Sequence, residues 1–356
     1  MKVGLITIVD PIPNYGNKLQ HYATYAVLKR MNNEVTSYTM EKPIISFKTR
    51  IAHIIHIVTR YRFTKQKTFW KYGYKKNMRF HIFNKTKLNI KYIKKTNGLE
   101  MKEDIFFVGS DQVWNTNWFN NKKEEMFLLK FIQDNKKKNS FSSSFGTDVL
   151  NKKWTERFSK ELSKFNYISV REEAGKRILN CLIKREVKVL VDPTMLLTKE
   201  EWRIISNKPV NAKEGYVLTY FLSPKCDDAS AVLERVKENR KVYELLDLND
   251  DIVGTATPEN FIWLFDHADI VLTDSFHACV FSFLFNKPFL VFDRNWNEKS
   301  MNSRLETLLS KFNLERKYYY SGIQNNVWEH DYSEGYKQLE MERRKAISFL
   351  ESVLRN

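Results

Sequence analysis

Short apolar runs alternate with helical patterns along most of the chain. Runs of about four to eight apolar residues, bounded by turn residues, are typical of buried parallel strands. Strands that alternate with helices favour parallel sheets covered by helices on both faces. We predict strands at Val3–Val9, Asp104–Val108, Asn139–Phe145, Tyr167–Val170, Lys188–Val191, Gly215–Leu222, Val242–Leu246, Ile270–Leu272 and Phe289–Phe292. We predict helices at Lys18–Met31, Glu172–Leu182, Ala229–Asn239, Pro258–His267, Phe276–Phe285, Ser303–Phe312 and Tyr332–Leu354.

The strand–helix–strand unit at residues 268–294 gives the clearest functional signal. Its first strand runs into Thr273, Asp274 and Ser275, residue types that cap helix N-termini well. His277 therefore falls in the first turn of the next helix. Ligands of open α/β sheets bind outside the carboxyl ends of the strands, where helix N-termini present N–H groups to anions. A titratable imidazole in this place indicates acid–base chemistry, although a histidine that only caps or packs would give the same pattern.

The chain of 356 residues is too long for one ordinary core and fits two domains. We predict an N-terminal Rossmann-like domain over residues 1–195, which contains a basic helical segment at 42–99, and a second Rossmann-like domain over 196–330. The charged helix within 331–356 is predicted to pack back on the first domain. Two Rossmann-like domains that face each other across a cleft make an α/β, GT-B-like fold.

Polar residues follow several predicted strands of the first domain, on the side where ligands bind. The loop after the first strand lacks the G-x-G-x-x-G pattern, so a dinucleotide fingerprint is absent. Arg171 either grips a carboxylate or phosphate with two nitrogens or pairs with Glu172 or Glu173 at the surface. Asp111 is either a second base or a turn-capping residue. The candidates on this side are Asn14, Tyr15, Gly16, Asn17, Asp111 and Arg171.

The second domain supplies His277 with neighbours that suit an anionic donor. Its further candidates are Ser275, Phe276, Arg294 and Arg304. No cluster has the spacing of metal ligands, so we expect acid–base and electrostatic catalysis without a metal or cofactor.

The net charge of +17 is concentrated in one segment, since Lys42–Leu99 holds sixteen Lys or Arg and no Asp or Glu. Isoleucines and aromatic residues are interleaved with these cations, and three interpretations stay open. We favour an anionic membrane surface as the partner of residues 42–95. A helix pair with one buried and one solvated face comes next. Nucleic acid comes last, because no recognised nucleic-acid module accompanies the charge.

Cysteine usage and hydropathy suggest a reducing compartment. Cys181, Cys226 and Cys279 lie far apart, without a disulfide or metal-ligand pattern. The N-terminal apolar run is short and has no cleavage site after it, and no stretch reaches the roughly 20 apolar residues of a membrane span. We therefore expect a cytoplasmic protein, peripheral at the inner face of the cell membrane.

An ordered set of motifs resembles the polysaccharide pyruvyl transferase family. The set reads NYGNKLQHYA, VGSDQVWN, SFG, SVREE, VDPT and TDSFHACVFSFLFNKPF, and it spans Val3 to about Leu309. The resemblance implies a GT-B-like fold and transfer of a pyruvyl group from phosphoenolpyruvate to a sugar diol of a cell-surface glycan, as a ketal. It also implies that His277 is the acid/base and that Arg171 holds the anionic groups of the donor. On this resemblance we assign Ser275, Phe276, Arg294 and Arg304 to the donor side, and Asn14, Tyr15, Gly16 and Asn17 to the acceptor side.

The chain departs from the family pattern at one point. Described members carry Arg-Leu-His where this chain has Ser275-Phe276-His277, so one donor-binding arginine is missing. Either Arg294 or Arg304 supplies the charge, or the donor differs. We expect an oligosaccharide acceptor attached to a lipid carrier. The alternatives are a GT-B glycosyltransferase that uses a nucleotide sugar in the same cleft, and a non-catalytic binder of anionic lipid or nucleic acid.

Overall fold

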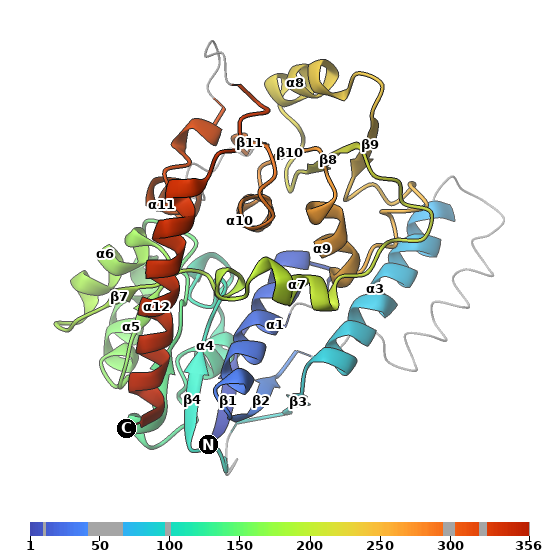
Figure 1. The fold of residues 1–356 in the computed structure, drawn as a ribbon. Helices are drawn as coiled ribbons and strands as arrows, with labels where there is room; N and C mark the ends of the chain where they lie inside the picture. Colours follow the sequence, from blue (N-terminus) through green and yellow to red (C-terminus); the bar gives the residue numbers. More distant parts are fainter. Residues whose placement is uncertain (10–11, 42–66, 97–100, 295–302, 320–325, 356) are drawn as a thin grey trace.

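The computed structural model of the chain describes residues 1–9, 12–41, 67–96, 101–294, 303–319 and 326–355. It is an α/β protein with two Rossmann-like halves, each built on a parallel sheet (Figure 1). The first sheet has the order β3-β2-β1-β4-β5, and the second has the order β11-β10-β8-β9. Because every described strand pair is parallel, the carboxyl ends of neighbouring strands lie at a common edge of each sheet.

The first sheet is covered on both faces, and alternate residues of its strands face opposite sides. Phe107 of β4 packs with the core beneath α1, whereas Phe106 packs with the core beneath α4, α5 and α6. The bounds are β1 Lys2–Ile6, β2 Glu34–Thr39, β3 Ile90–Tyr92, β4 Ile105–Val108 and β5 Lys138–Ser140. The covering helices are α1 Tyr15–Arg30, α4 Asn121–Phe127, α5 Thr155–Leu162 and α6 Glu173–Leu182.

A short strand pair extends the first sheet. Strands β6 Ser169–Val170 and β7 Lys188–Val189 pair in parallel. Single bridges, Asn139 with Tyr167 and Ser143 with Val170, join this pair to β5 and to the residues that follow β5. The chain then enters the 3-10 turn η4 Pro193–Leu196, which packs against α1. The carboxyl ends of β4, β6 and β7 thus come to the same edge.

The second sheet is also covered on both faces. Helix α8 Asp227–Lys237 packs on one side, and α9 Pro258–Asp266 and α10 Phe276–Leu284 pack on the other. Its strands are β8 Tyr216–Tyr220, β9 Lys241–Glu244, β10 Ile270–Thr273 and β11 Phe289–Val291. Helix α7 Lys199–Ile205 lies in the crossover between the halves, and its buried Trp202 packs against Phe281 of α10 with ring centroids 5.0 Å apart.

The two halves share one hydrophobic core, in which α1 of the first half meets α9 and α10 of the second. Tyr15 stands at the centre of this junction. Its ring stacks on Phe261 at 5.0 Å and meets Tyr220 edge-on at 6.0 Å. Burial of several aromatic rings at one contact fixes the relative position of the halves at this point.

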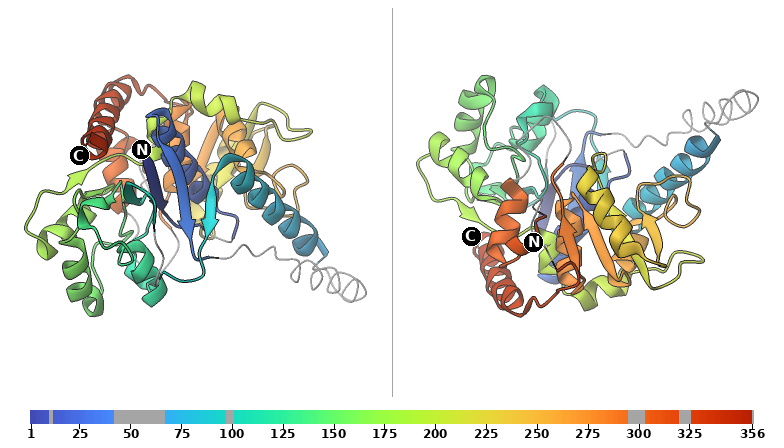
Figure 2. Two further views of the ribbon diagram at one scale, coloured as in Figure 1. Left: turned by 90° about the horizontal axis from the view of Figure 1, so that it is seen from below. Right: turned by 90° about the horizontal axis from the view of Figure 1, so that it is seen from above.

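Helix α3 Lys67–Lys87, the described part of the basic segment, lies beside the second half (Figures 1 and 2). Phe80 and Phe83 are buried, and Arg79 donates to the backbone oxygen of Thr255 at 2.8 Å. Lys76 is also buried, with its Nζ 3.4 Å from the backbone oxygen of Leu245. One face of α3 therefore packs on protein, as the second of the three interpretations requires. Residues 42–66 lie outside the described part of the chain.

Helix α12 Ser333–Arg355 runs along both halves (Figure 1). Near its start, Tyr336 stacks on Phe283 of α10 at 4.9 Å. Near its end, Phe349 stacks on Phe141, which follows β5, at 6.3 Å. Between these contacts, Arg343 donates to the backbone oxygens of Met195 and Leu197 at 2.7 and 2.9 Å. The division of the chain at 195/196 and 330/331 stays a prediction.

Two local expectations need correction. Helix α1 begins at Tyr15, with Asn14 as its N-cap, so the expected start at Lys18 is wrong. The strand expected at Asn139–Phe145 is β5, Lys138–Ser140. A single bridge between Ser143 and Val170 of β6 follows it, and Ser142 interrupts the strand because its φ of 48° lies outside the extended region. Within the described ranges, none of the helices combines the length and the apolar character that a membrane crossing needs.

Candidate functional site

The site forms where the N-terminus of α10 meets the N-terminus of α1. His277 lies in the first turn of α10, directly after β10, and it is 8% exposed. Its ring lies against Gly16 in the first turn of α1, where a Cβ atom would come within 2.1 Å of Nδ1. The absence of a side chain at position 16 is therefore what lets the imidazole approach the helix. The structure brings these two predicted residues together from opposite halves.

Asp192 is the acidic partner of His277, and the sequence analysis missed it. Its Oδ2 lies 3.7 Å from His277 Nε2, while Oδ1 accepts from the backbone N–H and the hydroxyl of Thr194 at 3.0 and 2.6 Å. Burial alone would raise the pKa of Asp192, but the interaction with His277 and the charge of Arg171 lower it below its ordinary value. A fixed negative charge thus faces the imidazole.

Arg171 is buried among carboxylates, with 1% of its side chain exposed. Its Nη1 lies 2.5 Å from Asp192 Oδ2, its Nη2 3.5 Å from Asp111 Oδ1, and its Nε 3.8 Å from Glu172 Oε2. The surface pair considered from the sequence is thus a buried network, in which Glu172 takes part. Among the described residues, Nε and Nη2 have no hydrogen-bond partner, so two nitrogens of this guanidinium can still donate.

Arg304 also lies near the ring of Phe276. The guanidinium carbons of Arg171 and Arg304 lie 4.9 and 5.9 Å from the centre of the Phe276 ring. With the Gln112 amide turned so that its oxygen faces Arg304, that oxygen accepts from Nη1 and Nη2 at 2.8 and 2.6 Å. Burial, together with the positive charges of Arg171 and Arg294, lowers the pKa of Arg304 to about 9. Two buried cations therefore lie near one aromatic ring next to His277.

Arg294 is hydrogen-bonded to the segment between β10 and α10, and Ser275 belongs to that segment. Arg294 donates from Nε to the backbone oxygen of Asp274 at 3.2 Å and lies 4.0 Å from that residue's carboxylate. Asp274 in turn accepts from the backbone N–H groups of Leu222 and Ser223 at 2.7 and 2.9 Å, which ties the loop after β8 to β10. Ser275 is 3% exposed and is the N-cap of α10. Of the two arginines considered for the missing charge, Arg304 is the one beside Phe276.

Asp111 connects the ionic network to α1. Its Oδ2 accepts from Asn17 Nδ2 at 3.0 Å, and Asn17 also donates to the backbone oxygen of Ile8 at 2.8 Å. Asp111 Oδ1 accepts from the backbone N–H of Gln112 at 2.8 Å, the turn-capping role considered from the sequence. Burial would raise the pKa of Asp111, but Arg171 and His277 lower it, so this carboxylate is ionised. The geometry is thus compatible with Asp111 as a second base and with Asp111 as a turn-capping residue.

Tyr15 is removed from the candidate acceptor residues by its burial. It is 0% exposed, and its hydroxyl donates to the backbone oxygen of Ala256 at 3.1 Å. The sequence interpretation failed here because Tyr15 was taken for a loop residue, whereas it is the first residue of α1 and faces the second half. Asn14 and Asn17 keep their places beside open space.

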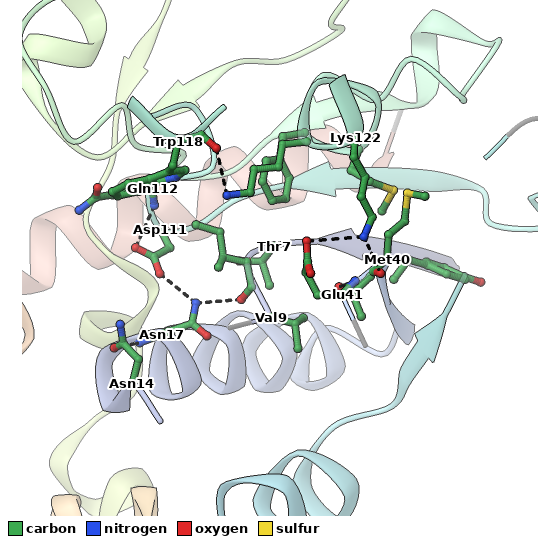
Figure 3. A pocket seen from close by; sticks show the side chains of 16 residues that line it. Thr7, Val9, Asn14, Asn17, Met40, Glu41, Asp111, Gln112, Trp118 and Lys122 are labelled. Carbon is green, nitrogen blue, oxygen red and sulfur yellow. Dashed lines mark hydrogen bonds and ion pairs between the residues drawn. The ribbon is translucent and has the colours of Figure 1, made fainter. Parts of the chain in front are cut away.

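A pocket of about 440 Å³ opens beside this network, at the carboxyl edge of the first sheet (Figure 3). Asn14, Asn17, Asp111 and Gln112 line one end, where Asp111 joins the pocket to the ionic network, and Lys122 of α4 lines the other end (Figure 3). Trp118, which lies between them along the chain and is 43% exposed, belongs to the lining. This volume is within the range of small-molecule sites.

Three functional candidates, Asp192, Trp118 and Lys122, were not predicted from the sequence, because their roles depend on tertiary contacts. Asp192 follows the strand at 188–191 and precedes a proline, so its place at a strand end was a usable signal. Trp118 and Lys122 lie on a loop and a short helix after β4, where no pattern distinguished them from other surface residues. In the described part of the chain, no group of three or more His, Cys, Asp or Glu side chains is placed to hold a metal ion.

Comparison with known families gives one match over most of the chain. A family model described as "Polysaccharide pyruvyl transferase" matches residues 14–295, which include Asn14, Asp111, Arg171, Asp192 and His277. A search of curated proteins finds no match.

Solved structures with similar folds are distant. A UDP-GlcNAc 2-epimerase from Neisseria meningitidis bound to UDP-GlcNAc shares 10% identity at a TM-score of 0.45, with 100% of each chain covered. The enzyme of the same name from Methanocaldococcus jannaschii, in complex with UDP-GlcNAc and UDP, shares 11% identity at 0.42, with 98% of this chain and 100% of that chain covered. A glycotransferase of kitacinnamycin shares 9% identity at 0.38, with 98% and 95% covered. Similarity at this level does not indicate shared chemistry.

Proposed function

The chain belongs to the polysaccharide pyruvyl transferase family, and on that premise we propose that it transfers a pyruvyl group from phosphoenolpyruvate to a sugar of a cell-surface polysaccharide precursor, as a ketal. The family indicates a transferase that acts on polysaccharide. The donor, the ketal product and the residue roles are our proposal. The observation that carries it is the His277–Asp192 pair at 3.7 Å, beside two buried guanidinium groups.

The two guanidinium groups suit a small anion that carries a carboxylate and a phosphate. Arg171 Nε and Nη2 and Arg304 Nε have no hydrogen-bond partner among the described residues. Buried donors without partners cost free energy, which an anion would recover through charge-assisted hydrogen bonds. The N-terminus of α10 adds its N–H groups and positive dipole end. In this assignment Arg304 takes the place of the arginine that the Ser275-Phe276-His277 sequence lacks.

The chemistry needs one proton relay and one leaving group. Protonation of the donor's methylene carbon makes the methyl group, and a sugar hydroxyl bonds to the adjacent carbon. A second hydroxyl then displaces phosphate from the same carbon and closes the ketal. The two hydroxyl protons end on the methyl group and on the phosphate, so the step consumes no other reactant. His277 serves as the acid and base of this relay, and the Asp192 carboxylate orients its ring.

Asp111 and the polar end of the pocket support the acceptor side. Asn14, Asn17 and Asp111 line the end of the pocket where Asp111 joins it to the ionic network (Figure 3). A sugar seated there would present hydroxyl groups towards the imidazole, and an ionised Asp111 would accept a hydrogen bond from one of them. We propose a lipid-linked oligosaccharide as the acceptor.

A donor-binding experiment tests this assignment. Titration calorimetry with phosphoenolpyruvate should give saturable binding to the wild-type protein, and His277→Ala should keep that binding while losing phosphate release in the presence of acceptor. Binding of a nucleotide sugar in place of phosphoenolpyruvate would support the glycosyltransferase alternative. Absence of binding to either donor would support a non-catalytic binder and overturn the proposal.

We also propose that the basic segment 42–95 faces an anionic membrane, which would bring the enzyme to a lipid-linked acceptor. Within the described part of α3, Lys75, Ile82 and Lys85 are exposed at helical spacing, so cations and an apolar side chain share one face. Flotation with vesicles that contain phosphatidylglycerol checks this. Equal recovery with neutral vesicles would contradict it.

A further inference from the structure

A second pocket adjoins the one beside His277, and the two share Lys122. The second pocket measures about 680 Å³. Lys122, Lys153 and Arg157 line it, with the amide side chains of Asn120 and Asn121. The two pockets meet at Lys122, and Asp111 of the first pocket belongs to the ionic network beside the imidazole.

The charged side chains that line the first pocket have both signs, whereas those that line the second pocket are all positive. Glu41 and Asp111 are the acids among the lining residues of the first pocket, and none lines the second. Lys122 Nζ lies 3.7 Å from Glu41, whereas Lys153 Nζ lies over the Trp154 ring, 5.3 Å from its centre. Arg157 of the second pocket pairs with Glu124, with Nη1 3.1 Å from Oε2. Lys153, which has no acid beside it in the lining, favours a ligand that carries negative charge away from the reacting sugar.

Aromatic side chains accompany the cations. Trp118 is 43% exposed where it lines the first pocket. An exposed indole next to polar groups offers an apolar face to the C–H side of a sugar ring, while the polar groups bond its hydroxyls. Trp114 and Trp154, the other tryptophans at this site, are buried. Packing gives no reason for the exposure of Trp118.

We propose that these two pockets form an extended acceptor groove for a negatively charged oligosaccharide. The proposal rests on the proposed function, whose acceptor class it narrows. One sugar lies on Trp118 with its reactive hydroxyls towards His277, and the anionic part of the chain lies against Lys122 and Lys153. The shared chemistry is an anionic group on the glycan, supplied either by acidic sugars or by a diphosphate linkage to a carrier.

The experiment measures binding of three probes to the full chain, without donor. The probes are tetragalacturonate, neutral maltotetraose, and N-acetylglucosamine linked through a diphosphate to a short alkyl chain. We expect at least one anionic probe to bind about tenfold more tightly than maltotetraose, with an affinity that falls as salt rises. Binding of tetragalacturonate would identify acidic sugars as the anionic group, and binding of the diphosphate-linked probe would identify the linkage to a carrier. Equal affinity for all three probes would overturn the proposal.

Variants locate the binding. Lys122→Glu combined with Lys153→Glu should abolish the preference for the anionic probe, and Trp118→Ala should weaken that probe without changing the salt dependence. Lys184→Glu, at an exposed lysine after α6, is the matched control and should bind like wild type. Full affinity in the double variant, with an unchanged melting temperature, would overturn the groove.

Failure of the groove and failure of the proposed function are distinguishable, because binding needs no turnover. Charge-selective glycan binding in a protein that does not use phosphoenolpyruvate would retain the groove and remove the donor. Phosphate release from phosphoenolpyruvate with a neutral acceptor, without a preference for anionic probes, would retain the donor and remove the groove.

Discussion

The imidazole of His277 lies against the backbone of Gly16, so closely that a Cβ atom at position 16 would come within 2.1 Å of Nδ1. The two residues begin helices of opposite halves, α1 and α10. The imidazole is thus held between the first turns of two helices. A single methyl group added to α1 must move the ring, because the backbone of α1 is fixed by the shared core.

Gly16→Ala should therefore remove most activity without unfolding the protein. A displacement of about 1 Å at a catalytic group costs roughly 100-fold in rate. Within a helix, alanine is favoured over glycine by about 1 kcal/mol, which offsets part of the clash. Phosphate release and chemical unfolding measure the two effects.

A double-mutant cycle controls this prediction. In a His277→Ala background the methyl group meets no ring, so Gly16→Ala should be neutral or stabilising there. The same loss of stability in both backgrounds would show that the methyl group disturbs α1 and not the imidazole.

Asp192 positions His277, and Asp192→Asn should lower kcat more than it changes the donor's KM. The amide keeps the size of the carboxylate but loses the negative charge that faces Nε2 at 3.7 Å. We expect kcat to fall at least about 100-fold, since acid–base catalysis contributes that much or more. Asp134→Asn, at an exposed N-cap, is the control. A wild-type kcat in Asp192→Asn would contradict the positioning role.

Arg304→Gln should weaken phosphoenolpyruvate binding. A hydrogen bond to a charged group contributes about 1.5–3 kcal/mol, so we expect the donor's Kd to rise roughly tenfold or more. Calorimetry measures this directly. Arg235→Gln, at an exposed position of α8, should leave the Kd unchanged. An unaffected Kd in Arg304→Gln would return the missing charge to Arg294 or remove phosphoenolpyruvate as the donor.

His21 should make the protein sensitive to mild acid. This histidine is 0% exposed, its Nε2 lies 2.7 Å from Ser37 Oγ, and burial followed by the charge of Lys18 lowers its pKa from 6.5 to about 3. The unfolded chain binds the proton more readily, so stability is complete above pH 6.5 and falls as pH drops towards 3. Between pH 7 and pH 5.5 we expect a loss of about 1.2 kcal/mol from this group.

Urea unfolding at the two pH values measures that loss. His21→Gln removes the titrating group and should shrink the difference between pH 7 and 5.5, whereas His330→Gln, at an exposed histidine, should keep it. An identical difference in both variants would assign the acid sensitivity to other groups.

The sequence predicted the alternation of strands and helices, and the structure confirms the α/β class with two Rossmann-like halves. It also located His277 and Arg171, because a residue directly after a buried strand lies at the carboxyl edge of a parallel sheet whatever the rest of the fold does. It misplaced Tyr15, since a loop and the first turn of a helix look alike when Asn14 and Asn17 are both good caps.

What the sequence determined by itself was local: hydrophobic period, capping residues and strand ends, all of which depend on neighbours within a few positions. The tertiary structure alone decided the contacts between residues far apart in the chain: Gly16 with His277, His277 with Asp192, and Phe276 with Arg171 and Arg304. These depend on how α1, α9 and α10 pack in one core, and close packing is a property of many side chains at once. No single motif carries that information, which is why the partner of the imidazole appeared only in the fold.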